Sequence, residues 1–256
     1  MSLFIKNMTV GYGQQTIVSD IQLPEVSAGS LVAVIGANAV GKSTLLKSLA
    51  GLLKYTGHAS FETQQLGFMT HRQRINTIGY LPQTLPQATT LVAYELVYCA
   101  CKASQTGLSS KQVDERIEQV FESLGIYDLA LRKMCEMSGG QRQMIGLAQV
   151  LVRQPKLLLL DEPTSALDLH WQLNVLGAIR QQTQNQNAIA LVASHDLNLA
   201  LRFCDQLLIL AGGRVLAMGK PRDALTPANL RSAYGIEGRI ESCSQGHPIV
   251  LADRAC

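Results

Sequence analysis

The stretch Gly36-Ala37-Asn38-Ala39-Val40-Gly41-Lys42-Ser43 decides the fold, because it matches the spacing Gly-x-x-x-x-Gly-Lys-Ser/Thr at every specified position. An apolar run over 31–35 precedes it and predicts a buried strand, and 43–49 continues as a helical pattern. In this context, backbone N–H groups and the helix N-terminus attract a polyphosphate. We expect Lys42 to contact the β- and γ-phosphates and Ser43 to bind Mg²⁺. The alternative is a glycine-rich strand-to-helix turn without a ligand.

Composition places the chain among globular proteins. Of its 256 residues, 47% are hydrophobic and 16% charged, which is not the composition of a disordered chain. The longest apolar runs are about half a dozen residues, far short of the roughly 20 that span a bilayer. The N-terminal residues 1–6 lack the apolar region of a signal peptide, so we expect a cytosolic protein.

Charge and cysteine usage exclude two further classes. The net charge of +3 is spread along the chain, which argues against a nucleic-acid partner. The six cysteines include no C-x-x-C pair and have no metal-ligand spacing. We expect reduced and mostly buried thiols.

The N-terminal part of the chain predicts strands over 3–10 and 16–23, joined by the turn Gly11-Tyr12-Gly13. Tyr12 is either a packed turn residue or a ring that faces a purine base, and the residues alone favour neither. The segment 57–77 is polar and carries little signal.

The middle of the chain changes from strand to helix. A strand over 79–81 stops at a proline and leaves Gln83 at a loop entrance. Helical patterns follow over 89–103 and 110–125, and we interpret about 84–150 as a helical insertion.

A second chemical feature is the acidic pair Asp161-Glu162, which follows the apolar run 157–160. Such a run is typical of a parallel strand that is covered on both faces, and α/β sheets bind ligands at the carboxyl ends of their strands. Asp161 can hold Mg²⁺, and Glu162 can accept a proton from, or orient, an attacking water. Alternatively, Asp161 caps a following helix.

Another buried strand is predicted over 188–193, and it ends in Ser194-His195-Asp196. His195 is either a structural histidine or a residue beside the γ-phosphate. Residues 206–210 and 214–218 predict a β-hairpin. Beyond Pro221 we expect a short helical piece and a polar tail without an assigned role.

The stretch Met137-Ser138-Gly139-Gly140-Gln141-Arg142-Gln143 resembles the L-S-G-G-Q signature of ATP-binding-cassette (ABC) ATPases. The other motifs follow in the order of that family, from Tyr12 to His195, and include Ser165-Ala166-Leu167-Asp168. The resemblance implies an α/β fold, namely a P-loop NTPase (ABC cassette) core with an antiparallel β subdomain and an inserted helical subdomain. The corresponding divisions are a core over 1–83 and 151–220, a helical subdomain over 84–150 and a C-terminal tail over 221–256.

The resemblance also implies a homodimer of cassettes packed head to tail, with ATP as substrate and Mg²⁺ as cofactor. The implied nucleotide-binding residues are Tyr12, Gly36, Asn38, Gly41, Lys42, Ser43 and Thr44. The implied catalytic residues are Glu162, His195 and Gln83, and the implied Mg²⁺ site is Ser43, Gln83 and Asp161. The residues implied to act across the dimer are Ser138, Gly139, Gly140 and Gln141 at the γ-phosphate and Asp168 in the coupling loop.

Two positions depart from the family pattern. Ala39 stands where glycine is usual, which is tolerable unless its φ must be positive. Met137 replaces leucine, a change that nearly conserves volume.

Within the family, 165–169, 195–200 and 213–235 look like ATP-binding subunits of bacterial importers for iron-siderophore, haem or cobalamin. This implies an integral-membrane permease that docks near Gln83, where Leu91, Val92, Leu96 and Val97 are candidates to line the groove. It also implies a solute-binding protein as an indirect partner and a peripheral location on the cytoplasmic face of the inner membrane.

Three alternatives remain open: a transporter of another substrate, such as an exporter or a manganese or zinc importer; a soluble ABC ATPase in DNA repair or on ribosomes; and a phosphate-loop kinase. The second usually has long coiled-coil insertions or two cassettes in one chain, and the third does not predict the Ser-Gly-Gly-Gln signature.

Overall fold

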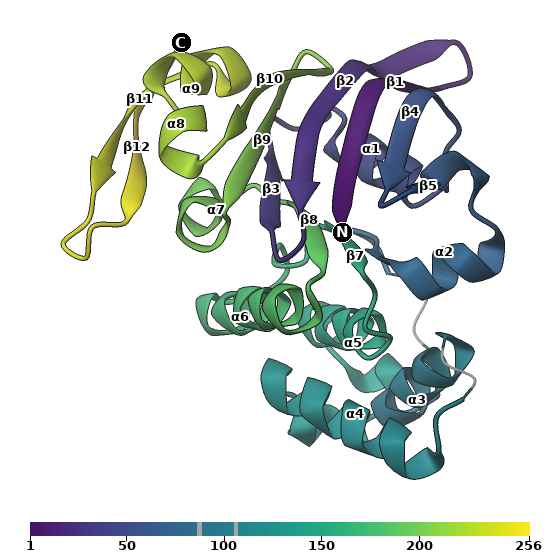
Figure 1. Ribbon diagram of the computed structural model, residues 1–256. Coiled ribbons are helices and arrows are strands. Elements are labelled where there is room, and N and C mark those ends of the chain that lie inside the picture. Colours follow the sequence, from purple (N-terminus) through teal and green to yellow (C-terminus); the bar gives the residue numbers. More distant parts are fainter. Residues whose placement is uncertain (86–88, 105–106) are drawn as a thin grey trace.

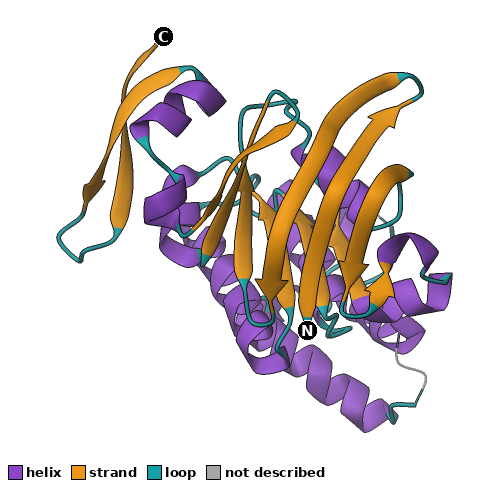
Figure 2. Cartoon of the chain, turned by 45° about the horizontal axis from the view of Figure 1, so that its top comes forward, coloured by secondary structure: helices purple, strands orange, loops and turns teal. Residues whose placement is uncertain are grey.

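The protein is a layered α/β structure, as seen in a computed structural model that describes residues 1–85, 89–104 and 107–256. Helices α5 and α6 lie beneath the larger sheet, and α3 and α4 lie beyond them (Figure 1). The strands of a smaller antiparallel sheet lie side by side along the opposite side of the molecule (Figure 2). The larger sheet therefore has apolar layers on both faces, and its strands alternate residues between two hydrophobic cores.

The larger sheet has the strand order β10-β9-β3-β8-β7-β6. Its strands are β3 (Leu31–Ile35), β6 (Ile78–Leu81), β7 (Leu157–Asp161), β8 (Ile189–Ala193), β9 (Gln206–Ala211) and β10 (Arg214–Gly219). The smaller sheet has the order β2-β1-β4-β5, with β1 (Ser2–Tyr12), β2 (Gln15–Ser27), β4 (Tyr55–Phe61) and β5 (Gln64–Gln65). Strands β11 (Ile236–Ser242) and β12 (Pro248–Ala255) form a separate antiparallel pair.

The α-helices are α1 (Lys42–Leu49), α2 (His71–Thr77), α3 (Ala93–Ser104), α4 (Ser110–Leu124), α5 (Gly139–Leu151), α6 (Leu169–Gln186), α7 (Leu197–Phe203), α8 (Pro221–Ala224) and α9 (Pro227–Tyr234). Short 3₁₀ helices cover Leu66–Phe68, Tyr127–Leu129 and Met134–Glu136. Local signals set these limits: α4 begins at a capping box made by Ser109 and Gln112, and it ends at Gly125 with φ 69°. None of the helices in the described ranges is long and apolar enough to cross a membrane.

The α/β fold class is confirmed, and the strands expected before and after the phosphate-binding loop are present and buried. The hairpin expected from 206 to 218 is also confirmed as β9 and β10. The helix expected over 110–125 is α4, whereas the one expected over 89–103 begins later, at Ala93. Residues 86–88 and 105–106 of the predicted insertion lie outside the described residues. The division into core, insertion and tail stays a prediction.

Two segments are more ordered than the sequence suggested. The supposedly irregular 57–77 contains most of β4, then β5 and α2. Strand β4 gave little signal because one run of it is solvent-exposed, and α2 depends on a capping box between Thr70 and Gln73 rather than on an apolar face. Beyond Pro221, the expected helical piece is present as α8 and α9, and the expected polar tail forms the β11–β12 hairpin.

Two further expectations were wrong. The first turn lies after Tyr12, since β1 continues to that residue and Gly13 has φ 59°. The thiols are free but not mostly buried, because burial holds only for two of them. Cys101 and Cys204 are buried, Cys243 is intermediate, and Cys99, Cys135 and Cys256 are exposed.

Asp205 ties three elements together at the amino end of the larger sheet. Its Oδ2 accepts a hydrogen bond of 2.8 Å from the backbone N–H of Leu31, at the start of β3. Its Oδ1 accepts one of 2.7 Å from Nη2 of Arg180 on α6, and this pairing raises the pKa of Arg180. The carboxylate therefore fixes the start of the strand that leads into the phosphate-binding loop.

We expect Asp205→Ala to lower the free energy of unfolding by about 1–3 kcal/mol, because a backbone donor and a guanidinium lose their acceptor. Asp205→Asn keeps one acceptor oxygen for the Leu31 N–H but replaces the other oxygen, which accepts from Arg180, by an NH2 donor, so it should lose less than Asp205→Ala. Urea denaturation of the two variants measures the difference. Equal losses would show that the bond to the strand contributes nothing.

Candidate functional site

The site lies where parallel strands of the larger sheet reach their carboxyl ends. Val34 of β3 and Asp161 of β7 both pair with Ala193 of β8, so the segments after these strands meet at one edge. A cavity of about 820 Å³ opens there. It is lined by Tyr12, Ile17, Asn38, Ala39, Gly41, Lys42, Ser43, Thr44, Gln83, Glu162 and His195.

The phosphate-binding loop needs glycine where the backbone turns. Gly36 has φ 147° and Gly41 has φ 107°, both in the range that favours glycine. A Cβ at Gly41 would lie 2.3 Å from Cγ1 of Val18, which explains why a larger residue does not fit. Lys42 folds over the loop and donates from Nζ to the Gly36 carbonyl at 2.8 Å. The same ammonium is 3.0 Å from the Ala37 carbonyl.

Charges of opposite sign lie under this loop. Burial lowers the pKa of Lys42, against the opposing effect of Glu162 and Asp161. Burial likewise raises the pKa of Asp161, and the hydrogen bond from Ser43 works against the rise. An anion above Lys42 and a cation beside Asp161 would each stabilise the charged form of its neighbour.

Ser43 and Asp161 are arranged to share a cation. The Ser43 Oγ donates to Asp161 Oδ1 at 2.9 Å. The other oxygen, Oδ2, is buried and has no hydrogen-bond partner among the described residues. A hydroxyl and a carboxylate with a free oxygen are hard oxygen ligands, so the pair fits Mg²⁺.

Glu162 is held by side chains from two other strand ends. Its Oε2 accepts a hydrogen bond of 2.9 Å from Nε2 of Gln83, and its Oε1 contacts Nε2 of His195. Glu162 has φ 52°, unusual for a residue with a side chain, and its N–H donates to the Ala193 carbonyl at 3.2 Å. Glu162 as a whole residue is 8% exposed, yet it lines the cavity. Its position is therefore fixed by strand register and by two polar partners.

The predicted site residues fall into two groups. Nine of them line the cavity together, and two more, Gly36 and Asp161, lie directly beneath it through their bonds to Lys42 and Ser43. The cavity lining, as far as the structure describes it, does not include Ser138, Gly139, Gly140, Gln141 or Asp168. The roles assigned to both groups stay predictions.

The predicted residues outside the cavity lining have local structural roles within the chain. Ser138 caps α5: its Oγ accepts from the Gln141 N–H at 3.2 Å, and the Gln141 Oε1 accepts from the Ser138 N–H at 3.1 Å. Asp168 caps α6 by accepting from the Trp171 N–H at 3.0 Å. A Cβ at Gly140 would lie 2.7 Å from the Ala166 carbonyl oxygen, so glycine there is required by packing inside the chain.

Sequence reasoning did not place Ile17 or Ala39 in the cavity, and it did not predict the backbone strain of Ala39. Ile17 is an apolar residue of β2, and nothing in its type distinguishes it from core residues. Ala39 has φ 60°, and a positive φ is strained for alanine, so this departure from the family pattern costs stability. The glycine that is usual at that position of the family pattern could have indicated the positive φ.

A phosphate-binding loop, a Ser–Asp pair suited to Mg²⁺ and a carboxylate in the same cavity define a P-loop nucleotide-binding ATPase fold. The family model described as "ABC transporter" matches residues 19–165, more than half of the chain. The chain belongs to the ABC transporter family, as an ATP-binding subunit and ATPase.

Relatives and solved structures agree with this assignment. The chain is 35% identical over 248 residues to the hemin import ATP-binding protein HmuV of Bordetella avium, covering 94% of each chain. It is 32% identical over 244 residues to the petrobactin import ATP-binding protein FpuD of Bacillus anthracis, covering 94% of this chain and 89% of the relative.

A metal-chelate type ABC transporter in an inward-facing conformation superposes with a TM-score of 0.81 at 26% identity, covering 99% of this chain and 98% of that one. A dimeric ATP-binding cassette bound to ADP and Pi has a TM-score of 0.77 at 24% identity, over 86% of this chain and 99% of that one, and shows the shared fold.

We expect Ala39→Gly to stabilise the protein by about 0.5–1 kcal/mol. Glycine adopts a positive φ without strain, and this gain exceeds the cost of its greater conformational entropy in the unfolded chain. Ala37→Gly is the matched control. Ala37 does not have a positive φ, so the same exchange should destabilise. Urea denaturation of the nucleotide-free protein measures both, and a loss of stability in both variants would contradict the prediction.

Proposed function

We propose that this chain hydrolyses ATP to power the import of an iron-siderophore, haem or cobalamin through a membrane permease. The observation that carries the ATPase part is the placement of Glu162 in the same cavity as Lys42, between Gln83 and His195. The hemin and petrobactin import proteins among its relatives support the cargo class. Import of another metal or substrate is the alternative.

Each part of ATP has a matching chemical group in this proposal. The loop N–H groups and the Lys42 ammonium bind the phosphates, and Thr44 and Asn38 complete the lining beside them. Tyr12 is 48% exposed at the mouth of the cavity, where its ring can stack on adenine. Ser43, Asp161 and Gln83 would hold Mg²⁺, which would neutralise charge on the phosphates.

Glu162 then serves as the proton acceptor for the attacking water. Its carboxylate accepts hydrogen bonds from two neighbours, which fixes its direction without using all of its acceptor capacity. Gln83 and His195 orient this group, and His195 is free to turn toward the γ-phosphate because its side chain is 41% exposed.

A second copy of the chain completes the site. Gly139 has open space around its Cβ position among the described residues, so nothing within those parts of the chain requires glycine there. The first turn of α5 presents N–H groups at this point, a suitable donor set for the γ-phosphate of a partner. Leu169, beside Asp168, is 66% exposed, which is consistent with a covered surface in a dimer.

The permease docks on the side of the molecule where strand β6 leads toward Gln83. A hollow of about 380 Å³ lies beside this strand, between the end of α1 and α2, and its lining includes Leu52 and Tyr80 but not Gln83. Leu52 is 62% exposed there, and Phe68, shortly before α2, is 82% exposed, so apolar surface is available on this side. Of the predicted groove residues, Leu91 is exposed, Val92 and Leu96 are half-buried, and Val97 is fully buried in the core.

The permease in turn places the chain at the cytoplasmic face of the membrane. A solute-binding protein delivers the cargo from the other side and does not contact this chain.

We expect Glu162→Gln to retain ATP binding while the rate of hydrolysis falls by at least about 10²-fold, since the amide cannot accept the proton. The variant should accumulate as an ATP-bound dimer in gel filtration with light scattering. Lys42→Ala is the contrasting variant and should lose tight ATP binding. Normal hydrolysis by Glu162→Gln would show that another group is the base.

We expect a polytopic permease to co-purify with this chain from its native membrane in detergent, identified by mass spectrometry. Leu52→Asp should abolish co-purification but keep ATP binding, because a charge then faces an apolar partner. Leu216→Asp on β10, at the far edge of the sheet, is the control, since Leu216 is 38% exposed. Recovery of soluble partners alone would favour a non-transport ABC ATPase.

A further inference from the structure

The C-terminal segment, to which no role has been assigned, reaches the phosphate-binding loop through Tyr234. This tyrosine is the last residue of α9, and α9 packs against β9 and β10 (Figure 1). Tyr234 also packs against the hydrophobic core that contains Ile35, the residue before Gly36. The C-terminal segment and the start of the loop therefore share one core.

The Tyr234 hydroxyl is a buried polar group that lies beside the loop backbone. Burial raises the pKa of Tyr234 to about 12, and the N–H of Gly36 opposes the rise, because an N–H donor close to the oxygen favours the phenolate. The hydroxyl is closed to solvent and forms no hydrogen bond of normal geometry within the described ranges, the Gly36 N–H included. Phenylalanine would fill the same space without burying an oxygen. The hydroxyl is therefore a costly group placed at the loop.

Gly36 is held on two further sides. Its carbonyl accepts a hydrogen bond of 2.8 Å from Nζ of Lys42. A Cβ at Gly36 would lie 2.4 Å from the Leu210 carbonyl oxygen, so β9 passes directly against the glycine. Tyr234, Lys42 and Leu210 thus surround the residue at which strand β3 gives way to the loop.

Helix α9 holds Tyr234 firmly. Thr226 caps the start of the helix, and its Oγ1 accepts from the Asn229 N–H at 3.1 Å. At the other end, Gly235 has φ 66°, and its carbonyl accepts a hydrogen bond of 2.8 Å from the N–H of Cys256, which follows β12. The hairpin is thereby tied to the residue next to Tyr234, and the tyrosine is carried by a helix that is fixed at both ends.

We propose that Tyr234 is a positioning residue of the nucleotide site, whose hydroxyl oxygen restrains the Gly36 N–H and so keeps the loop in the shape that binds phosphates. The inference rests on the proposed ATPase function. When phosphates attract the Lys42 ammonium, Lys42 leaves the Gly36 carbonyl, and the restraint by Tyr234 remains. The hydroxyl therefore stabilises the nucleotide-bound loop more than the empty one, and its effect is on affinity rather than on the hydrolysis step.

The test is isothermal titration of the full-length protein with ADP and Mg²⁺, because ADP places its phosphates in the same loop and is not hydrolysed. We expect Tyr234→Phe to weaken binding by about threefold to tenfold, the equivalent of one lost hydrogen bond. In ATPase assays, KM should rise by a similar factor while kcat changes by less than about twofold. A purely structural role would lower stability and leave the affinity unchanged.

Tyr55→Phe is the matched control, because Tyr55 has the same arrangement at a glycine outside the nucleotide cavity. Its hydroxyl is buried and forms no hydrogen bond of normal geometry with the part of the chain that the structure describes. Burial raises the pKa of Tyr55, and the backbone N–H of Gly67 opposes the rise. Urea denaturation should show similar changes in stability for both phenylalanine variants, whereas ADP affinity should fall only in Tyr234→Phe.

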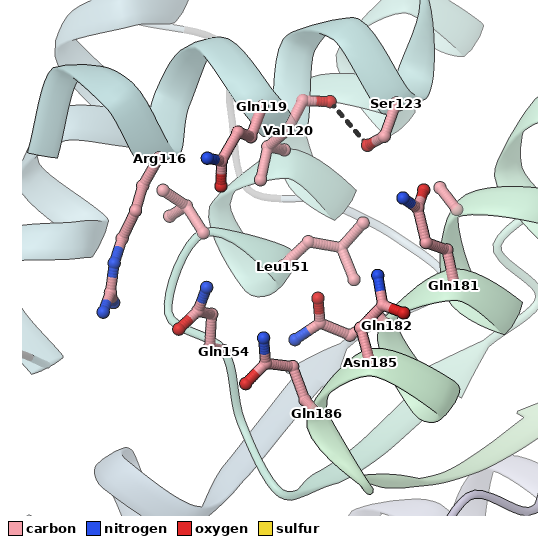
Figure 3. Close-up of a pocket in the computed structure, with 12 residues that line it drawn as sticks. Arg116, Gln119, Val120, Ser123, Leu151, Gln154, Gln181, Gln182, Asn185 and Gln186 are labelled. Carbon is pink, nitrogen blue, oxygen red and sulfur yellow. Dashed lines mark hydrogen bonds between the residues drawn. The ribbon is translucent and has the colours of Figure 1, made fainter. Parts of the chain in front are cut away.

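A second control removes a buried polar atom at the amino edge of the larger sheet. Nε2 of Gln182 is buried and has no hydrogen-bond partner among the described residues. Gln182 lies near the end of α6, which leads into the start of β8. Figure 3 shows its side chain among the amides of α6 beside Leu151, around a space of about 110 Å³. Gln182→Leu should leave ADP affinity unchanged.

Three results would overturn the proposal: unchanged ADP affinity in Tyr234→Phe, an equal loss of affinity in either control, or a fall in kcat at an unchanged KM. Absence of ATP hydrolysis by the unsubstituted chain would contradict the proposed function instead, because the ADP titration does not depend on hydrolysis. Failure of the unsubstituted chain to bind ADP would overturn both.

Discussion

The pairing of β8 with its two parallel neighbours is the constraint on which the nucleotide site depends. The Ser194 N–H donates to the Val34 carbonyl at 3.1 Å, and the Glu162 N–H donates to the Ala193 carbonyl at 3.2 Å. These backbone bonds set the phosphate-binding loop, the acidic pair and His195 at one height along the sheet. A shift of one residue in either pairing would turn the side chains to opposite faces and separate the groups.

The same edge concentrates buried charge. Asp161 and Glu162 lie next to each other in sequence and close to Lys42, and all three are nearly buried. Burial raises the pKa of Asp161 and lowers that of Lys42, so each charge is disfavoured there without further partners. A nucleotide with its cation supplies the missing partners for both signs. The site is thus electrostatically complementary to a nucleotide with its cation, which is why such residues mark functional sites.

Much of the fold and the site followed from residue types and spacing. Apolar runs such as 157–160 predicted strands because burial on both faces removes any alternation, and the loop motif predicted the position of Lys42. The failures had two causes. Strand β4 is defined by its pairing with the distant β1, whereas α2 depends on a local capping box that a search for apolar periodicity does not detect. The positive φ of Glu162 and Ala39 is likewise a property of the folded backbone, which residue type alone does not reveal.

The two signature glycines differ in whether packing inside the chain requires them. Gly140 is required inside the chain, because a Cβ there would meet the Ala166 carbonyl oxygen at 2.7 Å. Gly139 meets nothing within 4 Å among the described residues, so its lack of a side chain serves no packing there. Open space at a helix N-terminus lets an external group approach the backbone N–H groups closely. The cavity of one chain therefore holds the phosphate-binding loop and the carboxylate, and the proposed second copy would add donors that the described residues of one chain do not bring to that cavity.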